Sequence, residues 1–422
     1  MTRTHGFFTS DYWEDPLAIG DRERERAAIS QGTLPDGLPV WVISRYAEAR
    51  RALDDVRLSK DSATLVEAIG RQLKQAGYGD RRPSGMFELP HALFSDPPRH
   101  TRLRRLLLAG FTSSRVAALK PRFEEMTASL VAGLPHDAPV DLISRFAVPL
   151  PLAVICELLG VPVDDRDALR PLVDAMNVND PEEAPKASDE LVEYFSRLIA
   201  HKRRRPGDDL VSDLIHVADD QSDQLAEDEL LGTLFLLLNA GHDTSANLIG
   251  NALRVLLQDR RSRWRLVREH PEIIPNVVEE TLRYDCPVRM ATHRVVVEPV
   301  EYGGTTLLPG EIVLISLLSA NRDPRRYEHA GTFDPRREDL KHLGFGVGLH
   351  RCLGATLGRM EAEVALGVLA RAFPHAELAD RPLRRRCSPI MNGWEDLFAH
   401  LGGRSAGDAG GITAGRGVSS AC

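Results

Sequence analysis

The chain has 422 residues, and 53 lysines and arginines against 61 aspartates and glutamates give a formal net charge of −8. A negative balance excludes a generic nucleic-acid-binding protein, because such proteins are basic as a rule. Hydrophobic residues make up 43% of the chain and charged residues 27%. These values predict a folded protein with a large core and exclude a disordered or fibrous chain.

Cysteine usage and hydropathy restrict the compartment. The five cysteines are an odd number without Cys-x-x-Cys spacing, which argues against a disulfide framework or a zinc ribbon and favours a reducing compartment. Residues 1–16 lack the apolar segment of a signal peptide. The longest apolar stretch, residues 147–156, contains two prolines and is far shorter than the roughly 20 residues of a membrane-spanning helix. We therefore expect a cytoplasmic protein that does not span a membrane.

Taken in chain order, the hydrophobic patterns predict a mostly α-helical protein with a small β part. Residues 40–44 are rich in β-branched and aromatic residues and predict a short strand, as do residues 294–306. Residues 64–98 mix short patterned pieces with glycine and proline, so we expect an irregular connection that acts as a lid. Apolar residues three and four positions apart predict helices near residues 103–111, 191–198 and 353–373.

The domain boundary follows from the end of the sequence. Residues 402–422 are rich in glycine, alanine and serine and contain almost nothing apolar, so we expect a disordered tail. The patterned sequence before this tail predicts a single domain formed by residues 1–401.

Residues 226–257 predict a long helix with a polar interruption. The segment is apolar on nearly all sides from residue 230 to residue 238 and then turns polar at residues 239–245. Such a cluster inside a core helix is costly unless its groups find partners. One alternative is a helix end, with Asp243 or Thr244 capping a second helix. Because apolar periodicity resumes at Leu248, we favour one helix that is locally distorted at Gly241.

The most informative segment is residues 345–354, FGVGLHRCLG, directly before the predicted helix that ends near Phe373. Glycines permit positive φ and let the backbone approach a flat ligand, and a helix N-terminus stabilises a thiolate. One thiolate without neighbouring ligands suits a metal whose other ligands come from a cofactor, as in haem. Two plainer interpretations stay open from Cys352 and the glycines alone. These are a small buried side chain and a dinucleotide loop, although the βαβ context of the latter is missing.

The complete spacing Phe-x-x-Gly-x-x-x-Cys-x-Gly resembles the haem-binding loop of the cytochrome P450 family, in which a cysteine thiolate ligates haem iron. The resemblance implies the cytochrome P450 fold, with haem b between the long central helix and the cysteine-loop helix and with Cys352 as the axial ligand. It further implies that the haem or its propionates are contacted by His100, Arg104, Arg294, Phe345, Gly348, His350 and Gly354.

Other motifs follow in the order of this family. Residues 239–245, NAGHDTS, are similar to the oxygen-activation motif, which implies that Asp243 and Thr244 help to deliver protons. The strings Glu-Thr-Leu-Arg at 280–283 and Phe-Asp-Pro-Arg-Arg at 333–337 imply a buried structural triad of Glu280, Arg283 and Arg337. We expect the substrate pocket to draw on Met86, Phe87, Leu89, Leu237, Ala240, Val288, Ala291, Thr292, Ile390, Met391 and Asn392.

The resemblance implies a haem-thiolate monooxygenase that inserts one oxygen atom of O2 into an apolar or amphipathic organic substrate, by hydroxylation or epoxidation, in bacterial secondary-metabolite biosynthesis. A haem-thiolate catalyst of oxidative coupling or desaturation shares every motif. A non-catalytic haem sensor is a further alternative, against which the acid and alcohol at residues 243 and 244 argue.

The electron supply is expected to lie outside the chain. The sequence contains no flavin or ferredoxin module, so we expect a ferredoxin and a ferredoxin reductase as electron donors to a monomer. A basic patch near the cysteine side would steer an acidic ferredoxin, and a solvated arginine face is the equal alternative. The arginines of this expected patch are Arg102, Arg105, Arg351 and Arg359.

Overall fold

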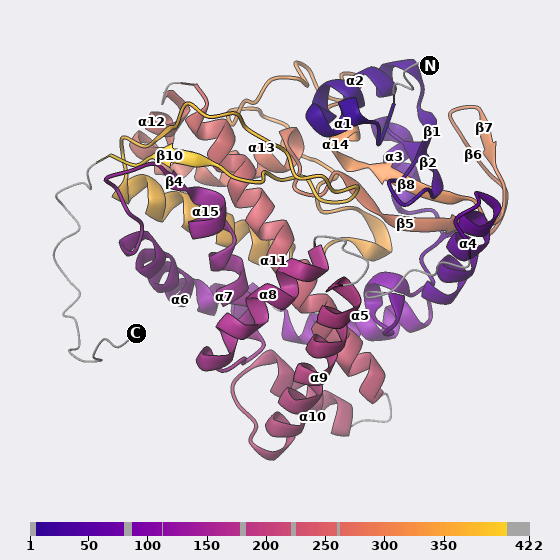
Figure 1. Ribbon diagram of the computed structural model, residues 1–422, viewed down its shortest axis with the longest axis horizontal. Coiled ribbons are helices and arrows are strands. Elements are labelled where there is room, and N and C mark those ends of the chain that lie inside the picture. The colour runs from indigo at the N-terminus through magenta and orange to yellow at the C-terminus, as the bar shows by residue number, and fades with distance from the viewer. Residues whose placement is uncertain are drawn as a thin grey trace.

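The computed structural model describes residues 6–79, 87–111, 113–177, 183–220, 225–259 and 262–402. Helix α11 crosses the middle of the molecule (Figure 1), with the larger sheet on one side and most other helices on the other. The helices are α1 (Ser10–Glu14), α2 (Pro16–Arg26), α3 (Tyr46–Leu53), α4 (Ser62–Gln75), α5 (Arg99–Gly110), α6 (Ser113–Ala132), α7 (Pro149–Leu158), α8 (Arg166–Asn177), α9 (Glu183–Arg204), α10 (Leu210–Asp220), α11 (Glu227–Leu257), α12 (Ser262–Glu269), α13 (Ile274–Tyr284), α14 (Leu317–Ala320) and α15 (Ala355–Ala372).

Within the described residues, the β part consists of three small sheets. The largest has the strand order β1 (Ile29–Thr33), β2 (Pro39–Ile43), β8 (Ile312–Ser316), β5 (Met290–Val296) and β3 (Leu58–Ser59). β2 and β8 are parallel, and the other neighbours are antiparallel. The smaller sheets pair β4 (Val140–Asp141), β10 (Phe398–His400) and β9 (Glu377–Leu378), and β6 (Val300–Tyr302) with β7 (Thr305–Leu307). The predicted mostly α fold with a small β part is therefore confirmed.

Helix α11 is the central element of the core. Its first turn carries Glu227, Asp228 and Glu229, whose charges are favourable at the positive end of the helix dipole. It packs against α7, α9, α12, α13 and α15. The helix continues through Gly241 without an end, so the prediction of one long helix is confirmed and the alternative of a second helix capped near residue 243 is wrong.

The expected irregular connection at residues 64–98 is partly wrong. Helix α4 occupies its first part, and the Asp61 carboxylate caps it by accepting a hydrogen bond from the Thr64 N–H at 3.0 Å. The apolar face that drives the helix into the core consists of Leu65, Ala68, Ile69 and Leu73. Beyond α4 the chain is irregular apart from a short 3-10 turn at Ala92–Phe94, and residues 80–86 lie outside the described residues.

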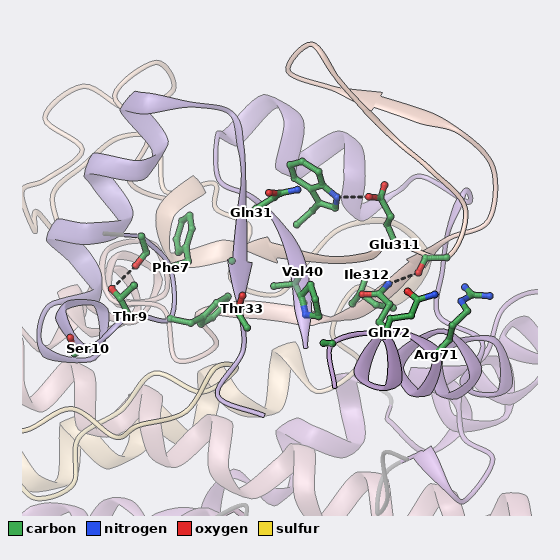
Figure 2. Close-up of a pocket in the computed structure, with 18 of the residues that line it drawn as sticks. Phe7, Thr9, Ser10, Gln31, Thr33, Val40, Arg71, Gln72, Glu311 and Ile312 are labelled. Atoms are coloured by element: carbon green, nitrogen blue, oxygen red, sulfur yellow. Dashed lines mark hydrogen bonds between the residues drawn. The ribbon is translucent and has the colours of Figure 1, made fainter. Parts of the chain in front are cut away.

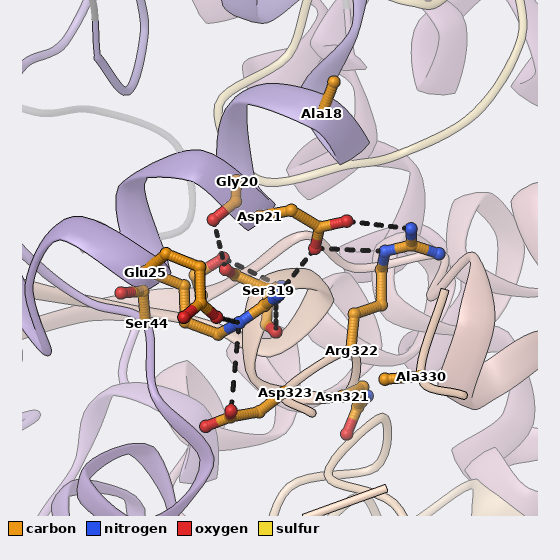
Figure 3. A network of polar contacts seen from close by, with 12 residues as sticks. Ala18, Gly20, Asp21, Glu25, Ser44, Ser319, Asn321, Arg322, Asp323 and Ala330 are labelled. Atoms are coloured by element: carbon orange, nitrogen blue, oxygen red, sulfur yellow. Dashed lines mark hydrogen bonds and ion pairs between the residues drawn. The ribbon is translucent and has the colours of Figure 1, made fainter. Parts of the chain in front are cut away.

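A polar network fixes α2 against the segment around α14 (Figure 3). Arg24 donates to the Ser319 carbonyl at 2.8 Å and to Asp21 at 2.7 Å, and Arg322 donates to the other oxygen of Asp21 at 2.9 Å. The Ser319 hydroxyl donates to the Gly20 carbonyl at 2.8 Å. These buried contacts tie the N-terminal helices to the end of β8, next to the cavity wall formed by Leu317.

Two sequence predictions concern the outer parts of the chain. Of the expected tail, residues 402–422, the structure describes only Gly402. The disorder expected for residues 403–422 stays a prediction, because these residues lie outside the described part of the chain. Among the helices described above, none is both long and apolar enough to cross a bilayer.

Candidate active site

Two cavities are lined by different kinds of side chain. The larger, about 1600 Å³, lies between the N-terminal residues, β1, β2 and α4 (Figure 2). Two polar side chains on its wall bind other lining residues, because Trp41 Nε1 donates to Glu311 Oε1 at 3.0 Å and Gln72 Nε2 donates to the Gly310 carbonyl at 2.5 Å. The second cavity lies between α5, α11 and the segment before α15, and Cys352 is on its wall. This second cavity is the candidate active site.

The cysteine loop, residues 345–354, is held in one shape by its backbone. Gly346 and Gly348 have φ angles of 64° and 72°, in the left-handed region that favours glycine. A Cβ on Gly348 would collide with the Asp54 carboxylate, so a larger residue does not fit there. The Cys352 N–H donates to the Phe345 carbonyl at 2.8 Å. The loop thus holds the cysteine two positions before Gly354, the N-cap residue of α15.

The Cys352 side chain is accessible from the cavity, although protein surrounds it on its other sides. Burial raises the pKa of this thiol, while the Gly354 N–H and the guanidinium groups of Arg104 and Arg359 oppose the shift. The described residues contain no group of three histidine, cysteine or acidic side chains that could hold a metal ion. A metal bound to Cys352 within this part of the chain would therefore need most of its ligands from a cofactor.

Six basic side chains gather on the same cavity wall, and no described acidic side chain forms an ion pair with them. They are Lys60, His100, Arg104, Arg294, His350 and the exposed Arg351. The rings of His100 and His350 lie 4.3 Å apart, and both ring nitrogens of His100 are buried without a hydrogen-bond partner. Arg294 is also buried, its Nε has no partner, and burial lowers its pKa to about 10. Buried donors that lack acidic partners fit the two propionates of a haem.

The two histidines respond to this environment in the same way. Burial lowers the pKa of His350, and the neighbouring Lys60, His100 and Arg294 lower it further. Burial is also the largest cause of the lowered pKa of His100, followed by Arg104. Both rings are therefore held neutral, and a neutral imidazole still donates one hydrogen bond to a carboxylate.

The predicted acid and alcohol of α11 lie in different environments. Thr244 is on the cavity wall, and its hydroxyl donates to the Ala240 carbonyl at 2.7 Å. Asp243 is buried and is not among the residues that line the cavity. Its Oδ1 is 2.5 Å from Arg386 Nη1, and its Oδ2 has no hydrogen-bond partner. The ion pair ties Asp243 to the segment between β9 and β10, so of the two residues expected to deliver protons only Thr244 lines the cavity.

Sequence analysis missed a second acid, Glu361 of α15. This side chain lies on the cavity wall near Ser245 of α11 and is buried. Burial raises its pKa to about 8, and the nearby Ser245 hydroxyl opposes the shift without forming a well-aligned hydrogen bond. The available signal was an acid four positions after Leu357, on the apolar face of an amphipathic helix.

The three residues of the expected triad lie together. Arg283 makes two hydrogen bonds of 2.7 Å to the two Glu280 oxygens, and both side chains are fully buried. Arg337 Nε is 3.6 Å from Glu280 Oε2. The remaining Arg283 donors reach the carbonyls of Asn321, Ala330 and Thr332. The cluster thereby joins α13 to the segment that leads into the cysteine loop.

The expected substrate-pocket residues divide into two groups. Those on the cavity wall are Leu237, Ala240, Val288, Ala291 and Thr292. Phe87, Leu89, Ile390, Met391 and Asn392 are not on this wall, contrary to the prediction, and Met86 lies outside the described residues. Phe87 instead stacks on Phe94 at 4.4 Å, and the Asn392 amide binds Asp285. Lining residues that the sequence analysis missed include Lys60, Ala92, Leu93, Leu236, Leu248 and Ser245.

The expected basic patch is weakened by internal ion pairs. Arg102 Nη2 is 2.5 Å from Glu229, and Arg359 Nε is 2.5 Å from Glu279. Arg105 and Arg351 are exposed. The prediction of four arginines that all offer their charge to a partner is therefore wrong for Arg102 and Arg359.

Comparison with known proteins agrees with this geometry. The cytochrome P450 family model matches residues 152–386. The chain is 43% identical to cytochrome P450 107B1 of Saccharopolyspora erythraea, over 86% of this chain and 89% of that protein. It is 33% identical to the polyketide biosynthesis cytochrome P450 PksS of Bacillus subtilis, over 95% and 98%. The tirandamycin C-bound P450 monooxygenase TamI matches with a TM-score of 0.85 and 38% identity, over 93% and 98%. The chain belongs to the cytochrome P450 family.

Proposed function

We propose that this oxygenase inserts one oxygen atom of O2 into an apolar or amphipathic organic molecule of bacterial secondary metabolism. The observation that carries the proposal is the placement of Cys352 on a cavity whose wall also holds six basic side chains that form no ion pair with a described acidic side chain. The similarity to a polyketide biosynthesis enzyme and to a tirandamycin C-bound monooxygenase supports the class of substrate.

The family implies a haem with a cysteine thiolate ligand, and the residues on the cavity wall fit that group. In the proposal Cys352 is the ligand of haem b, and His100, Arg104, Arg294 and His350 bind the propionates. Thiolate-ligated haem supplies the activation of O2, because the thiolate pushes electron density towards oxygen and favours O–O cleavage. The glycines of the cysteine loop keep its backbone turned and free of side chains at the cavity edge.

Two residues of the cavity wall are placed to hold and move protons. The Thr244 hydroxyl gives its own proton to the Ala240 carbonyl, so its oxygen lone pairs stay available to a donor in the cavity. Glu361, with a pKa near 8, keeps a proton at neutral pH and sits on the same wall. Asp243 lies outside the cavity lining, where its Oδ1 is 2.5 Å from Arg386 Nη1.

The rest of the wall positions the substrate and excludes water. Leu236, Leu237 and Leu248 of α11 present apolar side chains, which favour an apolar or amphipathic molecule. In the proposal a ferredoxin and its reductase supply the electrons to a monomeric enzyme, and the exposed Arg105 and Arg351 contribute positive charge for docking.

The test is the carbon monoxide difference spectrum of the reduced protein. We expect a strongly red-shifted Soret band in the wild type and in the Cys387→Ala control, which removes another exposed cysteine. Cys352→Ala should lose this band while it keeps its fold. A wild-type protein that is folded and loaded with haem but lacks the red shift would contradict the proposal. Retention of the red shift in Cys352→Ala would contradict it equally.

A further inference from the structure

Lys60 is a buried lysine with an unusual environment. It directly follows β3, and only 3% of its surface is exposed. Its Nζ lies on the wall of the active-site cavity and donates to the Thr292 hydroxyl at 2.6 Å. The aromatic ring of Phe94 lies below the amine, with its centroid 5.3 Å away. The chain therefore keeps the long side chain of Lys60 folded inwards and directs its amine towards the cavity.

No described acidic side chain forms an ion pair with this amine. Asp96 is the nearby acid, but one of its oxygens accepts the Lys60 backbone N–H at 3.1 Å and the other accepts the Ser59 hydroxyl at 2.5 Å. Burial and the charge of the nearby Arg294 hold the pKa of Lys60 well below its usual value, although the charge of Asp96 opposes the shift. A buried ammonium without a counter-ion is costly. An anion bound in the cavity would supply that counter-ion and favour the charged amine.

The chemistry of the site selects the kind of anion. Thr292 uses an oxygen lone pair to accept from Lys60, so its hydroxyl proton is free to donate to another acceptor. The lysine amine and the hydroxyl together offer two neighbouring donors and at most one positive charge. These match the two oxygens and the single charge of a carboxylate. The surrounding Ala92, Leu93 and Ala291 are apolar and suit the carbon chain next to such a group.

We propose that Lys60 and Thr292 form a binding site for one carboxylate in the active-site cavity. The proposal rests on the haem-thiolate function proposed above and adds to it a residue pair that recognises an acidic group. Two sources supply that chemistry, a carboxylate of the organic substrate or a propionate of the haem. Both residues line the same cavity as the apolar side chains, and Lys60 is near enough to His100, Arg294 and His350 for their charges to interact.

The experiment compares purified holoenzymes with the substitutions Lys60→Met, Thr292→Val and Lys60→Arg. Lys341→Met is the matched control, because Lys341 is exposed. The first readout is the spin-state titration of the ferric protein with dodecanoic acid and with 1-dodecanol, which differ only in the charged end. The second readout is the rate of haem transfer to apomyoglobin. A red-shifted carbon monoxide band in each protein confirms that the haem-thiolate centre is intact.

The two sources predict different results. If the substrate supplies the carboxylate, Lys60→Met and Thr292→Val weaken dodecanoic acid binding, Lys60→Met by about tenfold or more, and 1-dodecanol binding is unchanged. If the haem supplies it, Lys60→Met speeds haem transfer by a similar factor. Lys60→Arg keeps a positive charge, so it should retain most of the wild-type acid affinity in the first case and most of the wild-type haem retention in the second. The proposal is overturned if haem transfer is unchanged in Lys60→Met and, in addition, dodecanoic acid binds this variant as tightly as the wild type. It is equally overturned if haem transfer is unchanged and the wild type does not bind dodecanoic acid. A wild-type protein without the red-shifted band overturns the haem-thiolate function instead.

Discussion

Replacement of Arg283 by alanine tests whether the buried triad holds the cysteine loop in place. The substitution removes both hydrogen bonds to Glu280 and the donors to the carbonyls of Asn321, Ala330 and Thr332. The Glu280 carboxylate then keeps only the Asp334 N–H at 2.8 Å and Arg337 at 3.6 Å. A fully buried carboxylate is thus left without its main counter-ion.

The expected cost follows from this loss. Breaking a buried ion pair by removal of one partner costs about 3–5 kcal/mol, because the other charge stays buried and uncompensated. A typical protein has only about 5–15 kcal/mol of stability in total. Arg337→Ala should cost less, since its guanidinium is farther from Glu280. Arg197→Ala, which removes an exposed ion pair to Glu193 within α9, should cost no more than about 0.5 kcal/mol.

Urea unfolding and haem content of the purified proteins measure the effect. We expect Arg283→Ala to give less soluble protein, a lower unfolding midpoint and a lower ratio of haem to protein, with Arg337→Ala in between and Arg197→Ala equal to the wild type. Arg283→Lys retains a charge but not the paired geometry and should recover only part of the loss. Wild-type stability and haem content in Arg283→Ala would refute the assignment of the triad as a structural element.

Three further predictions concern the proton path and its acids. Thr244→Ala should still bind haem and oxidise NADPH with a surrogate ferredoxin and reductase, but release more of the electrons as hydrogen peroxide, whereas Thr244→Ser should restore the coupling. Arg386→Gln should lower product formation with a larger solvent isotope effect, because it removes the charge that faces Asp243; an unchanged isotope effect would contradict this role. Glu361 has a folded pKa raised from 4.5 to about 8, so its contribution to stability is complete below about pH 4.5 and is lost as the pH rises towards 8. In Glu361→Gln that part of the pH dependence should disappear from the unfolding curves.

The elements that were predicted correctly carry a local signal. Helix α11 spans more than eight turns, with apolar periodicity on both sides of the polar residues 239–245, and the strand at residues 39–43 has a compact β-branched run. The cysteine loop is recognisable because its spacing lies within ten residues. The helix α4 was missed because glycines and polar residues interrupt its pattern, although Leu65, Ala68, Ile69 and Leu73 form one buried face.

The parts that sequence could not provide depend on packing between distant segments. Asp243 and Arg386 are separated by 143 positions, and Lys60 and Thr292 by 232. No periodicity links such pairs, so the direction of the Asp243 carboxylate and the presence of Lys60 in the cavity emerge only from the folded chain. Phe87 was placed on the substrate pocket by its apolar character, whereas an aromatic partner, Phe94, holds it in a different cluster.

The distribution of charge connects the fold to the proposed cofactor. The whole chain carries a net charge of −8, yet the cavity wall gathers Lys60, His100, Arg104, Arg294 and His350. Burial disfavours such a cluster and lowers the pKa of each of these five side chains. Repulsion from neighbouring basic groups lowers the pKa of Lys60, His100, Arg104 and His350 further. A bound anionic ligand makes the electrostatic contribution of this cluster favourable, because each basic group then lies near an opposite charge. A ligand that binds only the folded state also stabilises it by mass action. The same side chains that make the cavity costly to fold therefore make it selective for a group with carboxylates next to its metal.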